Sequence, residues 1–153
     1  MIVFLSLGSN IGNRAEHIQL ALDLLAQQGI NNLQCAPLIK SAALLPQNAQ
    51  NDWDKEFLNT VAKGETELSP QELLKIIKEI EQKIGRQARG HWGPREIDVD
   101  ILDYNGQILT SDTLNLPHAQ MHLRNFVLKP LMELDPDWQH PILHKTAREL
   151  LNL

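Results

Sequence analysis

The hydrophobic positions at the start of the chain follow first the spacing of a strand and then that of a helix. Residues 2–6 are rich in β-formers and run into Gly8-Ser9-Asn10, which predicts a strand that ends in a glycine turn. After Asn13, apolar residues recur every three to four positions, which indicates a helix. Gly29 follows this pattern and is expected to be a left-handed cap, and residues 33–41 are expected to form the next strand.

The middle of the chain combines a segment without periodicity with the clearest helix signal in the sequence. Residues 45–56 contain a proline and several Asn and Asp residues, so we predict a long mobile loop. Residues 57–67 are then expected to form a strand. Ser69 and Pro70 supply an N-cap and a proline at the first helical position, and the apolar residues that follow share one face. This pattern predicts a helix over residues 70–84.

A second irregular segment leads into an alternating strand. Glycine recurs within residues 85–94 too often for a regular element, which predicts another loop. In residues 96–104 apolar side chains alternate with aspartates, as in a strand with one buried face. The remaining residues contain a turn at Asn105-Gly106, short strands around Ser111-Asp112, a helical stretch at 125–134 and a short final helix near Thr146.

The order of these elements predicts the fold class. Strand, helix, strand, strand, helix, strand is the βαββαβ order of an α+β sandwich. We therefore expect a ferredoxin-like antiparallel sheet with helices packed on one face, followed by C-terminal elements. The 153 residues suffice for one domain with a single core, and no linker or repeat divides them, so residues 1–153 are interpreted as a single domain.

Composition and charge narrow the function classes. With 42% hydrophobic and 22% charged residues, the chain is typical of a folded globular protein. Its formal net charge of -5 at pH 7 provides no overall attraction to nucleic acid or anionic lipid. A single cysteine cannot form an intrachain disulfide, and no apolar run approaches the roughly 20 residues of a transmembrane helix. We therefore expect a cytoplasmic protein that binds neither nucleic acid nor membranes.

Asp98 and Asp100 form the first candidate site. In a strand they project to the same face, while Ile97, Val99 and Ile101 enter the core. Two neighbouring carboxylates repel each other unless a cation bridges them, and oxygen ligands at this spacing suit Mg²⁺. The exposed polar face of a half-buried strand has the same spacing, so the aspartates alone leave both interpretations open.

A basic, glycine-rich loop precedes this strand. Arg86 and Arg95 belong to a run of basic residues between positions 83 and 95 that contains no acidic residue, although the chain as a whole is acidic. Arginines on such a loop suit bidentate binding of phosphate, and Mg²⁺ on the neighbouring aspartates would neutralise the same polyphosphate. The pattern indicates a nucleoside triphosphate site, with ordinary surface ion pairs as the alternative. Trp92 is either a loop anchor or a lid over a planar ligand.

Other motifs support less chemistry. Residues 7–12 lack the Gly-Lys-Ser/Thr ending of a phosphate loop, so a structural turn is favoured. His118 and His122 have the spacing of zinc ligands on a helix, but no third ligand is evident. Cys35 lies in a predicted strand without a nucleophile elbow, so a hydrolase is not supported. Trp138 is expected at the edge of the core or on the surface.

Residues 92–102, Trp-Gly-Pro-Arg-Glu-Ile-Asp-Val-Asp-Ile-Leu, resemble the signature of the 6-hydroxymethyl-7,8-dihydropterin pyrophosphokinase family. Further similar blocks occur in the family's order at residues 7–12, 57–59, 85–86 and 116–131, so the resemblance covers nearly the whole chain. It implies that the chain transfers diphosphate from ATP to 6-hydroxymethyl-7,8-dihydropterin in folate biosynthesis, and that AMP is the second product.

The resemblance also implies roles for individual residues. Asp98 and Asp100 would bind two Mg²⁺ ions, and Arg86 and Arg95 would contact the ATP phosphates and take part in catalysis. The nucleotide site would also include Glu81, Ile101, His118 and Arg124. The pterin site would comprise Phe57 and Phe126 on the two faces of the ring, Asn59 at its edge, Ser41, Ala42 and Leu44 along the pocket, and Trp92 as its cover.

Some positions depart from the family pattern. His91, Ala119 and Lys78 stand where many members carry arginine, a larger residue or proline, and glutamine. Residues 46–56 resemble the longer loop of folate enzymes fused to dihydropteroate synthase, so we expect that next enzyme of the pathway as a partner and the chain itself to be a monomer. The loops at 45–56 and 85–94 are expected to close over ATP and pterin.

Two other functions share parts of this pattern. RNA-recognition domains have the same element order, but they need aromatic and basic residues on the central strands, and the strand at 57–67 offers only Phe57 as an aromatic. An ordinary kinase would transfer the terminal phosphate alone and form ADP. The nucleotide product therefore distinguishes the kinase from the pyrophosphokinase.

Overall fold

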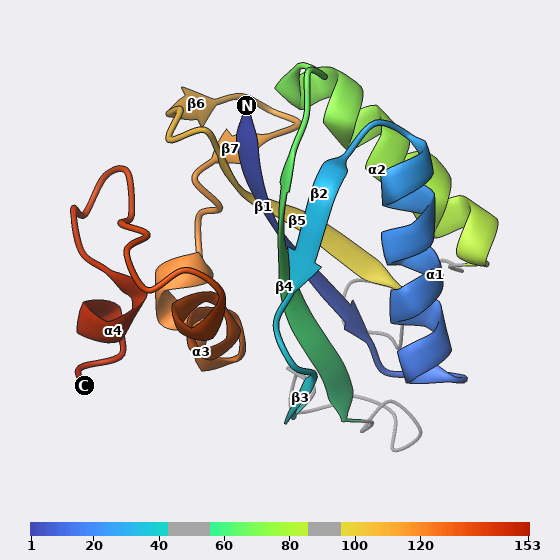
Figure 1. Ribbon diagram of the computed structural model, residues 1–153, viewed down its shortest axis with the longest axis horizontal. Coiled ribbons are helices and arrows are strands. Elements are labelled where there is room, and N and C mark those ends of the chain that lie inside the picture. Colours follow the sequence, from blue (N-terminus) through green and yellow to red (C-terminus); the bar gives the residue numbers. More distant parts are fainter. Residues whose placement is uncertain (43–55, 86–95) are drawn as a thin grey trace.

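The computed structural model describes residues 1–42, 56–85 and 96–153. Within these ranges an antiparallel sheet carries helices on both of its faces (Figure 1). The α+β class that the sequence predicts is confirmed, and the elements follow the predicted βαββαβ order except that one predicted strand is divided in two. The loops expected at 45–56 and 85–94, including their closure over ligands, lie almost wholly outside the described residues.

Among the described residues, the main sheet contains five strands. They are β1 (Ile2–Ser9), β2 (Asn31–Cys35), β3 (Ile39–Ser41), β4 (Phe57–Glu65) and β5 (Asp98–Tyr104). Their order is β2-β4-β1-β5, with β3 also paired to β4, and all pairs are antiparallel. β1 therefore lies between β4 and β5, which is the split βαβ topology of a ferredoxin-like sheet.

Two strand predictions need correction. β1 continues through Gly8, where the sequence predicts a turn, because Gly8 pairs with strands on both of its sides. The single strand expected at 33–41 is divided into β2 and β3, and Pro37 lies between them. Proline has no N–H to donate to a strand ladder, which explains the interruption.

Two helices cover one face of the sheet. They are α1 (Arg14–Gln27) and α2 (Pro70–Ile84), and both begin where the sequence predicts. Asn13 caps α1 through its side chain, and Ser69 forms a reciprocal capping box with Glu72 at the start of α2. These caps satisfy backbone N–H groups that have no partner within the helix.

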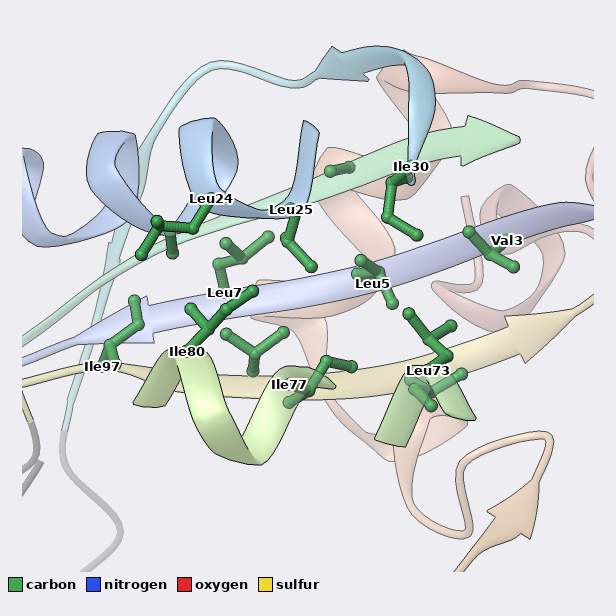
Figure 2. Packing of buried hydrophobic residues seen from close by; sticks show 14 of the residues in the cluster. Val3, Leu5, Leu7, Leu24, Leu25, Ile30, Leu73, Ile77, Ile80 and Ile97 are labelled. Atoms are coloured by element: carbon green, nitrogen blue, oxygen red, sulfur yellow. The ribbon is translucent and has the colours of Figure 1, made fainter. Parts of the chain in front are cut away.

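Alternate residues of β1 form the centre of the main core. Val3, Leu5 and Leu7 are at most 1% exposed and belong to the same core cluster as Leu25 of α1 and Ile77 of α2 (Figure 2). Burying each such side chain stabilises the fold by roughly 1.5–3 kcal/mol relative to leaving it exposed. The central strand is therefore a firm support for whatever lies on the opposite face of the sheet.

The C-terminal part of the chain covers much of that opposite face. Its helices are η2 (Met121–Leu123), α3 (Asn125–Leu134) and α4 (Ala147–Leu150). The element order predicts helices on one face alone, and this second layer corrects that prediction. Three adjacent strands each present an apolar side chain to the second layer, Phe4 from β1, Val61 from β4 and Leu102 from β5. These side chains require cover from the C-terminal segment.

A small hairpin links β5 to the C-terminal layer. β6 (Leu109–Thr110) pairs with β7 (Asn115–Leu116), as the sequence predicts. Asn105 and Gly106 have φ values of 51° and 71°, which confirms the turn expected there. In the part of the chain that the structure describes, no helix is both long and apolar enough to cross a membrane.

Candidate active site

Asp98 and Asp100 lie at the end of the sheet where β1 stops and β4 and β5 begin. Asp98 pairs with Gly8 of β1, and Asp100 pairs with Ser6. Val99, between the two aspartates, is buried in the core beneath the helices. Because side chains alternate along a strand, both carboxylates face the opposite side of the sheet, as the sequence predicts.

A β-bulge separates this pair from the third aspartate of the strand. The register between β1 and β5 shifts between Phe4 and Leu5, which leaves Leu102 as the extra residue. Asp103 is consequently 5% exposed, and its Oδ2 accepts a 2.9 Å hydrogen bond from Nε1 of Trp138. Trp138 is itself buried. Asp103 therefore fastens the C-terminal layer to the sheet.

Glu81 of α2 is held against the strand of the aspartates. Its side chain is 3% exposed, and Oε2 accepts a 3.0 Å hydrogen bond from the backbone N–H of Val99. Lys78 Nζ lies 3.7 Å from the other carboxylate oxygen. Val99 N–H points away from β1, so Glu81 fixes the free edge of β5 between Asp98 and Asp100.

The electrostatics of the aspartate pair favour a bound cation. The pKa of Asp100 is raised to about 6, first by burial and second by the neighbouring charge of Asp98, while the positive charge of Arg124 opposes both effects. Two carboxylates of like charge on one face fit a Mg²⁺ site. Among the described residues, no group of three or more His, Cys, Asp or Glu side chains could hold a metal ion.

His118 lies next to the aspartate pair. Its Nε2 is 3.9 Å from Oδ2 of Asp100, and its Nδ1 accepts a 3.2 Å hydrogen bond from the backbone N–H of Gln120. The pKa of His118 is lowered to about 4, first by burial and second by the positive charge of Arg124, while Asp98 opposes both effects. His118 is therefore neutral near pH 7. Because Nδ1 accepts, the ring proton resides on Nε2, on the side of Asp100.

Arg124 lies near the Phe126 ring, and its charge acts on His118. Its guanidinium carbon lies 5.7 Å from the centre of the Phe126 ring, within the range of a cation–π interaction. Its Nη2 donates a 2.9 Å hydrogen bond to Oε1 of Gln120. The charge of Arg124 also adds to the lowering of the pKa of His118 and partly offsets the rise in the pKa of Asp100. Residues expected at the nucleotide and at the pterin therefore lie close together here.

Asn59 and Phe57 occupy the start of β4. Asn59 is 5% exposed and pairs with Gly8 across the sheet. Its Nδ2 donates hydrogen bonds to Oγ of Ser41 at 2.8 Å and to the carbonyl of Ile39 at 3.4 Å. β3 thus orients the Asn59 amide. Asn59, Gly8 and Asp98 form one row across β4, β1 and β5.

The remaining residues expected in the site either lie elsewhere than predicted or fall outside the residues that the structure describes. The side chain of Ile101 is in the core under the helices, so its backbone alone would be available to a nucleotide. Ala42 directly follows β3. Gly8, which the glycine pattern places in a turn, instead lies in β1 between Asn59 and Asp98. Leu44, Arg86, Trp92 and Arg95, together with His91, fall outside the residues that the structure describes.

Comparisons with known proteins agree on a family. Residues 4–136 match the family described as 7,8-dihydro-6-hydroxymethylpterin-pyrophosphokinase (HPPK). A 2-amino-4-hydroxy-6-hydroxymethyldihydropteridine pyrophosphokinase of Aquifex aeolicus is 40% identical over 147 residues, which cover 96% of this chain and 88% of the relative. The folate synthesis bifunctional protein of Chlamydia trachomatis serovar D is 43% identical over 136 residues, but these span only 30% of its length and 88% of this chain.

Solved structures support the fold. A Plasmodium falciparum HPPK-DHPS wild-type structure is similar over 99% of this chain and 44% of its own, with a TM-score of 0.70 and 16% sequence identity. Together with the family match and the Aquifex relative, this places the described sheet and its aspartate strand in a known class of proteins. The chain belongs to the 7,8-dihydro-6-hydroxymethylpterin-pyrophosphokinase family, the enzymes that transfer diphosphate from ATP to the pterin alcohol in folate synthesis.

Proposed function

We propose that this chain transfers diphosphate from ATP to 6-hydroxymethyl-7,8-dihydropterin, with Asp98 and Asp100 holding two Mg²⁺ ions beneath the triphosphate. The observation that carries this proposal is the row of Asn59, Gly8 and Asp98 across three neighbouring strands. The flat pterin would bind at the Asn59 end of this row, and the metal-bound triphosphate would bind at the Asp98 end. The two substrates would then lie next to each other on one face of the sheet.

The metal end depends on the carboxylates of β5. When bound, Mg²⁺ would neutralise the phosphate oxygens and act as a Lewis acid on the transferred group. Asp98 and Asp100 would hold it, and Glu81 keeps their strand in place through Val99 N–H. His118 offers Nε2–H as an uncharged hydrogen-bond donor beside Asp100, since its pKa is about 4. Arg86 and Arg95, which we assign to the phosphates, lie outside the described residues.

The pterin end depends on β3, β4 and α3. Phe57 and Phe126 would lie against the two faces of the pterin ring, and the oriented amide of Asn59 would form hydrogen bonds to the edge of the ring. Ser41 contributes by holding that amide, and Ala42 follows it at the end of β3. Leu44 and Trp92, which we assign to the pocket wall and its cover, lie outside the part of the chain that is described.

The chemistry is an in-line substitution at the β-phosphorus of ATP. The hydroxymethyl oxygen forms the new bond to the β-phosphorus and loses its proton, while the bond between this phosphorus and the α,β-bridging oxygen breaks and AMP leaves. No protein nucleophile is required. The site contributes by positioning the two substrates and stabilising the charge of the transferred group.

Identifying the nucleotide product tests this proposal. The protein is incubated with ATP, Mg²⁺ and the pterin alcohol, and the products are separated by chromatography. We expect AMP and pterin diphosphate in equal amounts. Stoichiometric ADP with a pterin monophosphate would instead establish an ordinary kinase. An RNA-binding role has less support, because Phe4 and Val61 on the sheet face that such domains expose are buried beneath the C-terminal layer.

We further propose that residues 1–153 act as one monomeric domain and deliver their product to dihydropteroate synthase. The 30% coverage of the bifunctional Chlamydia relative is consistent with this link, because that protein joins further folate chemistry to a region like this one. Sedimentation at increasing protein concentration tests the monomer. Transfer of labelled pterin diphosphate to a dihydropteroate synthase in the presence of an unlabelled competitor tests direct delivery.

A further inference from the structure

Gly8 is a glycine that its own backbone does not require. It lies within β1, with neighbours on both sides, and it is not among the described glycines with positive φ. Glycine in a strand interior weakens the strand and often marks a place where another group approaches the backbone closely. The reason for glycine at this position must therefore lie above the sheet.

The space above Gly8 is limited by two side chains of β4. A Cβ atom at this position would lie 3.0 Å from Oδ1 of Asn59 and 3.3 Å from Cδ1 of Phe57. Both distances are shorter than ordinary van der Waals contacts, so one of the two side chains would have to move. Asn59 is the less free to do so, because its Nδ2 is bound to Oγ of Ser41 at 2.8 Å.

The same bond determines what Asn59 presents to a ligand. With Nδ2 turned toward Ser41, the carbonyl oxygen Oδ1 is the atom near Gly8. A carbonyl oxygen accepts hydrogen bonds, so it would select a ring edge that carries an N–H donor. A side chain at position 8 would displace this acceptor.

Gly8 also lies between the two halves of the site. Asn59 and Asp98 pair with Gly8 from opposite sides, so the row that they form spans about two strand spacings, or about 10 Å. A substrate that is bound at Asn59 and reacts above Asp98 must cross β1 at Gly8.

We propose that Gly8 is a specificity-determining residue of this site: its bare backbone keeps Oδ1 of Asn59 in place and leaves a path for the pterin from Asn59 to the aspartates. This inference rests on the proposed function. Gly8 is assigned to pterin binding alone, so a substitution at position 8 should leave the affinity for the nucleotide unchanged.

The first test compares Gly8→Ala with the unaltered protein. We expect the KM for the pterin to rise at least about tenfold, while the dissociation constant for a non-hydrolysable ATP analogue with Mg²⁺ changes less than about twofold, since small misplacements of a bound substrate are costly. An unchanged KM for the pterin would overturn the inference. If the unaltered protein forms no AMP at all, the proposed function itself has failed, which is a different result.

Gly106→Ala is the matched control. Gly106 has a φ of 71° with no atom near its missing Cβ, so alanine there strains the backbone but fills no site. This variant should lose stability in urea and keep the KM for the pterin. An equal rise in KM for both variants would attribute the effect of Gly8→Ala to general destabilisation and overturn the inference.

A double-mutant cycle tests the route through Asn59. Ser41→Ala removes the group that holds the Asn59 amide. If Gly8→Ala acts by displacing this amide, the double variant should raise the KM for the pterin less than the product of the two single effects. Independent, fully multiplicative effects would contradict the proposed route.

A measurement on the unaltered protein covers the case in which Gly8→Ala does not fold. In the presence of Mg²⁺ and the ATP analogue, saturating pterin should give nuclear Overhauser contacts between the two α protons of Gly8 and the ligand. It should leave the amide of Val3, at the other end of β1, unchanged. Saturation with no contact and no shift at Gly8 would overturn the inference.

Discussion

The backbone N–H of Val99 donates a 3.0 Å hydrogen bond to Oε2 of Glu81, between the two aspartates of β5. The acceptor belongs to α2 and is 3% exposed, so the bond ties the core helix directly to the strand that carries the candidate metal ligands. β5 is an edge strand, and without this acceptor its outward N–H would be a buried donor without compensation. Glu81 therefore helps to hold Asp98 and Asp100 in position through the backbone of the residue between them.

Removing this acceptor should loosen the strand. We predict that Glu81→Ala lowers the free energy of unfolding by about 1–3 kcal/mol, because the Val99 N–H loses its partner. It should also raise the Mg²⁺ concentration for half-maximal AMP formation. Glu81→Gln retains an acceptor and should restore most of the stability. Urea unfolding and Mg²⁺ titrations measure both effects.

Glu79→Ala is the control for this prediction. Glu79 lies on the same helix and is exposed, so its substitution should change neither quantity appreciably. A Val99 amide that exchanges with solvent equally slowly in Glu81→Ala and in the unaltered protein would contradict the role of the bond.

Replacing either aspartate should separate chemistry from folding. We predict that Asp98→Asn or Asp100→Asn leaves circular dichroism unchanged and lowers turnover about a hundredfold or more, because a charged ligand of the metal is lost. The exposed Asp112→Asn is a control that should retain full turnover. Near-normal AMP formation by either variant at ordinary Mg²⁺ concentration would refute the metal assignment.

The raised pKa of Asp100 predicts a dependence of stability on pH in the metal-free protein. Its value of about 6 exceeds the ordinary 3.8, so the folded protein binds more protons than the unfolded chain between these two pH values. The contribution of Asp100 to stability therefore falls as the pH rises from about 4 to about 6. With 37% of its side chain exposed, solvent screening limits the effect to about 1 kcal/mol or less.

Two measurements follow from this behaviour. Asp100→Asn should be more stable than the unaltered protein at pH 7 and equally stable at pH 4, as judged by urea unfolding without metal. In the unaltered protein, Mg²⁺ must compete with the proton of Asp100, so the half-maximal Mg²⁺ concentration should rise below about pH 6, by at most about tenfold per pH unit. A flat Mg²⁺ requirement between pH 5 and pH 7, or a stability gain of Asp100→Asn that is independent of pH, would contradict this account.

The bond between Trp138 and Asp103 should stabilise the C-terminal layer. We predict that Trp138→Phe lowers the free energy of unfolding by about 1–3 kcal/mol, because it leaves Oδ2 of the buried Asp103 without its donor. Asp103→Asn in the Trp138→Phe background should recover part of this loss by removing the buried charge. If Trp138→Phe unfolds at the same urea concentration as the unaltered protein, the bond contributes nothing measurable.

Signals that span a few residues were sufficient for much of the fold. Ser69 and Glu72 are three positions apart and predict the start of α2 without any knowledge of the rest of the chain. The alternation around Asp98 and Asp100 likewise predicts that the two carboxylates share a face, since that depends only on strand geometry. The resemblance of residues 92–102 then indicated the family, which the comparisons show.

The sequence by itself therefore determined the element types, the fold class, the family and the aspartate pair. These features depend only on the spacing of nearby residues and on one contiguous motif. Tertiary structure decided that Gly8 is a strand residue under Asn59, that Glu81 holds Val99, and that a bulge at Leu102 brings Asp103 to Trp138. Each of these depends on the register between strands or the packing of a distant helix. Such pairings join residues 18 to 51 positions apart, so no local pattern encodes them.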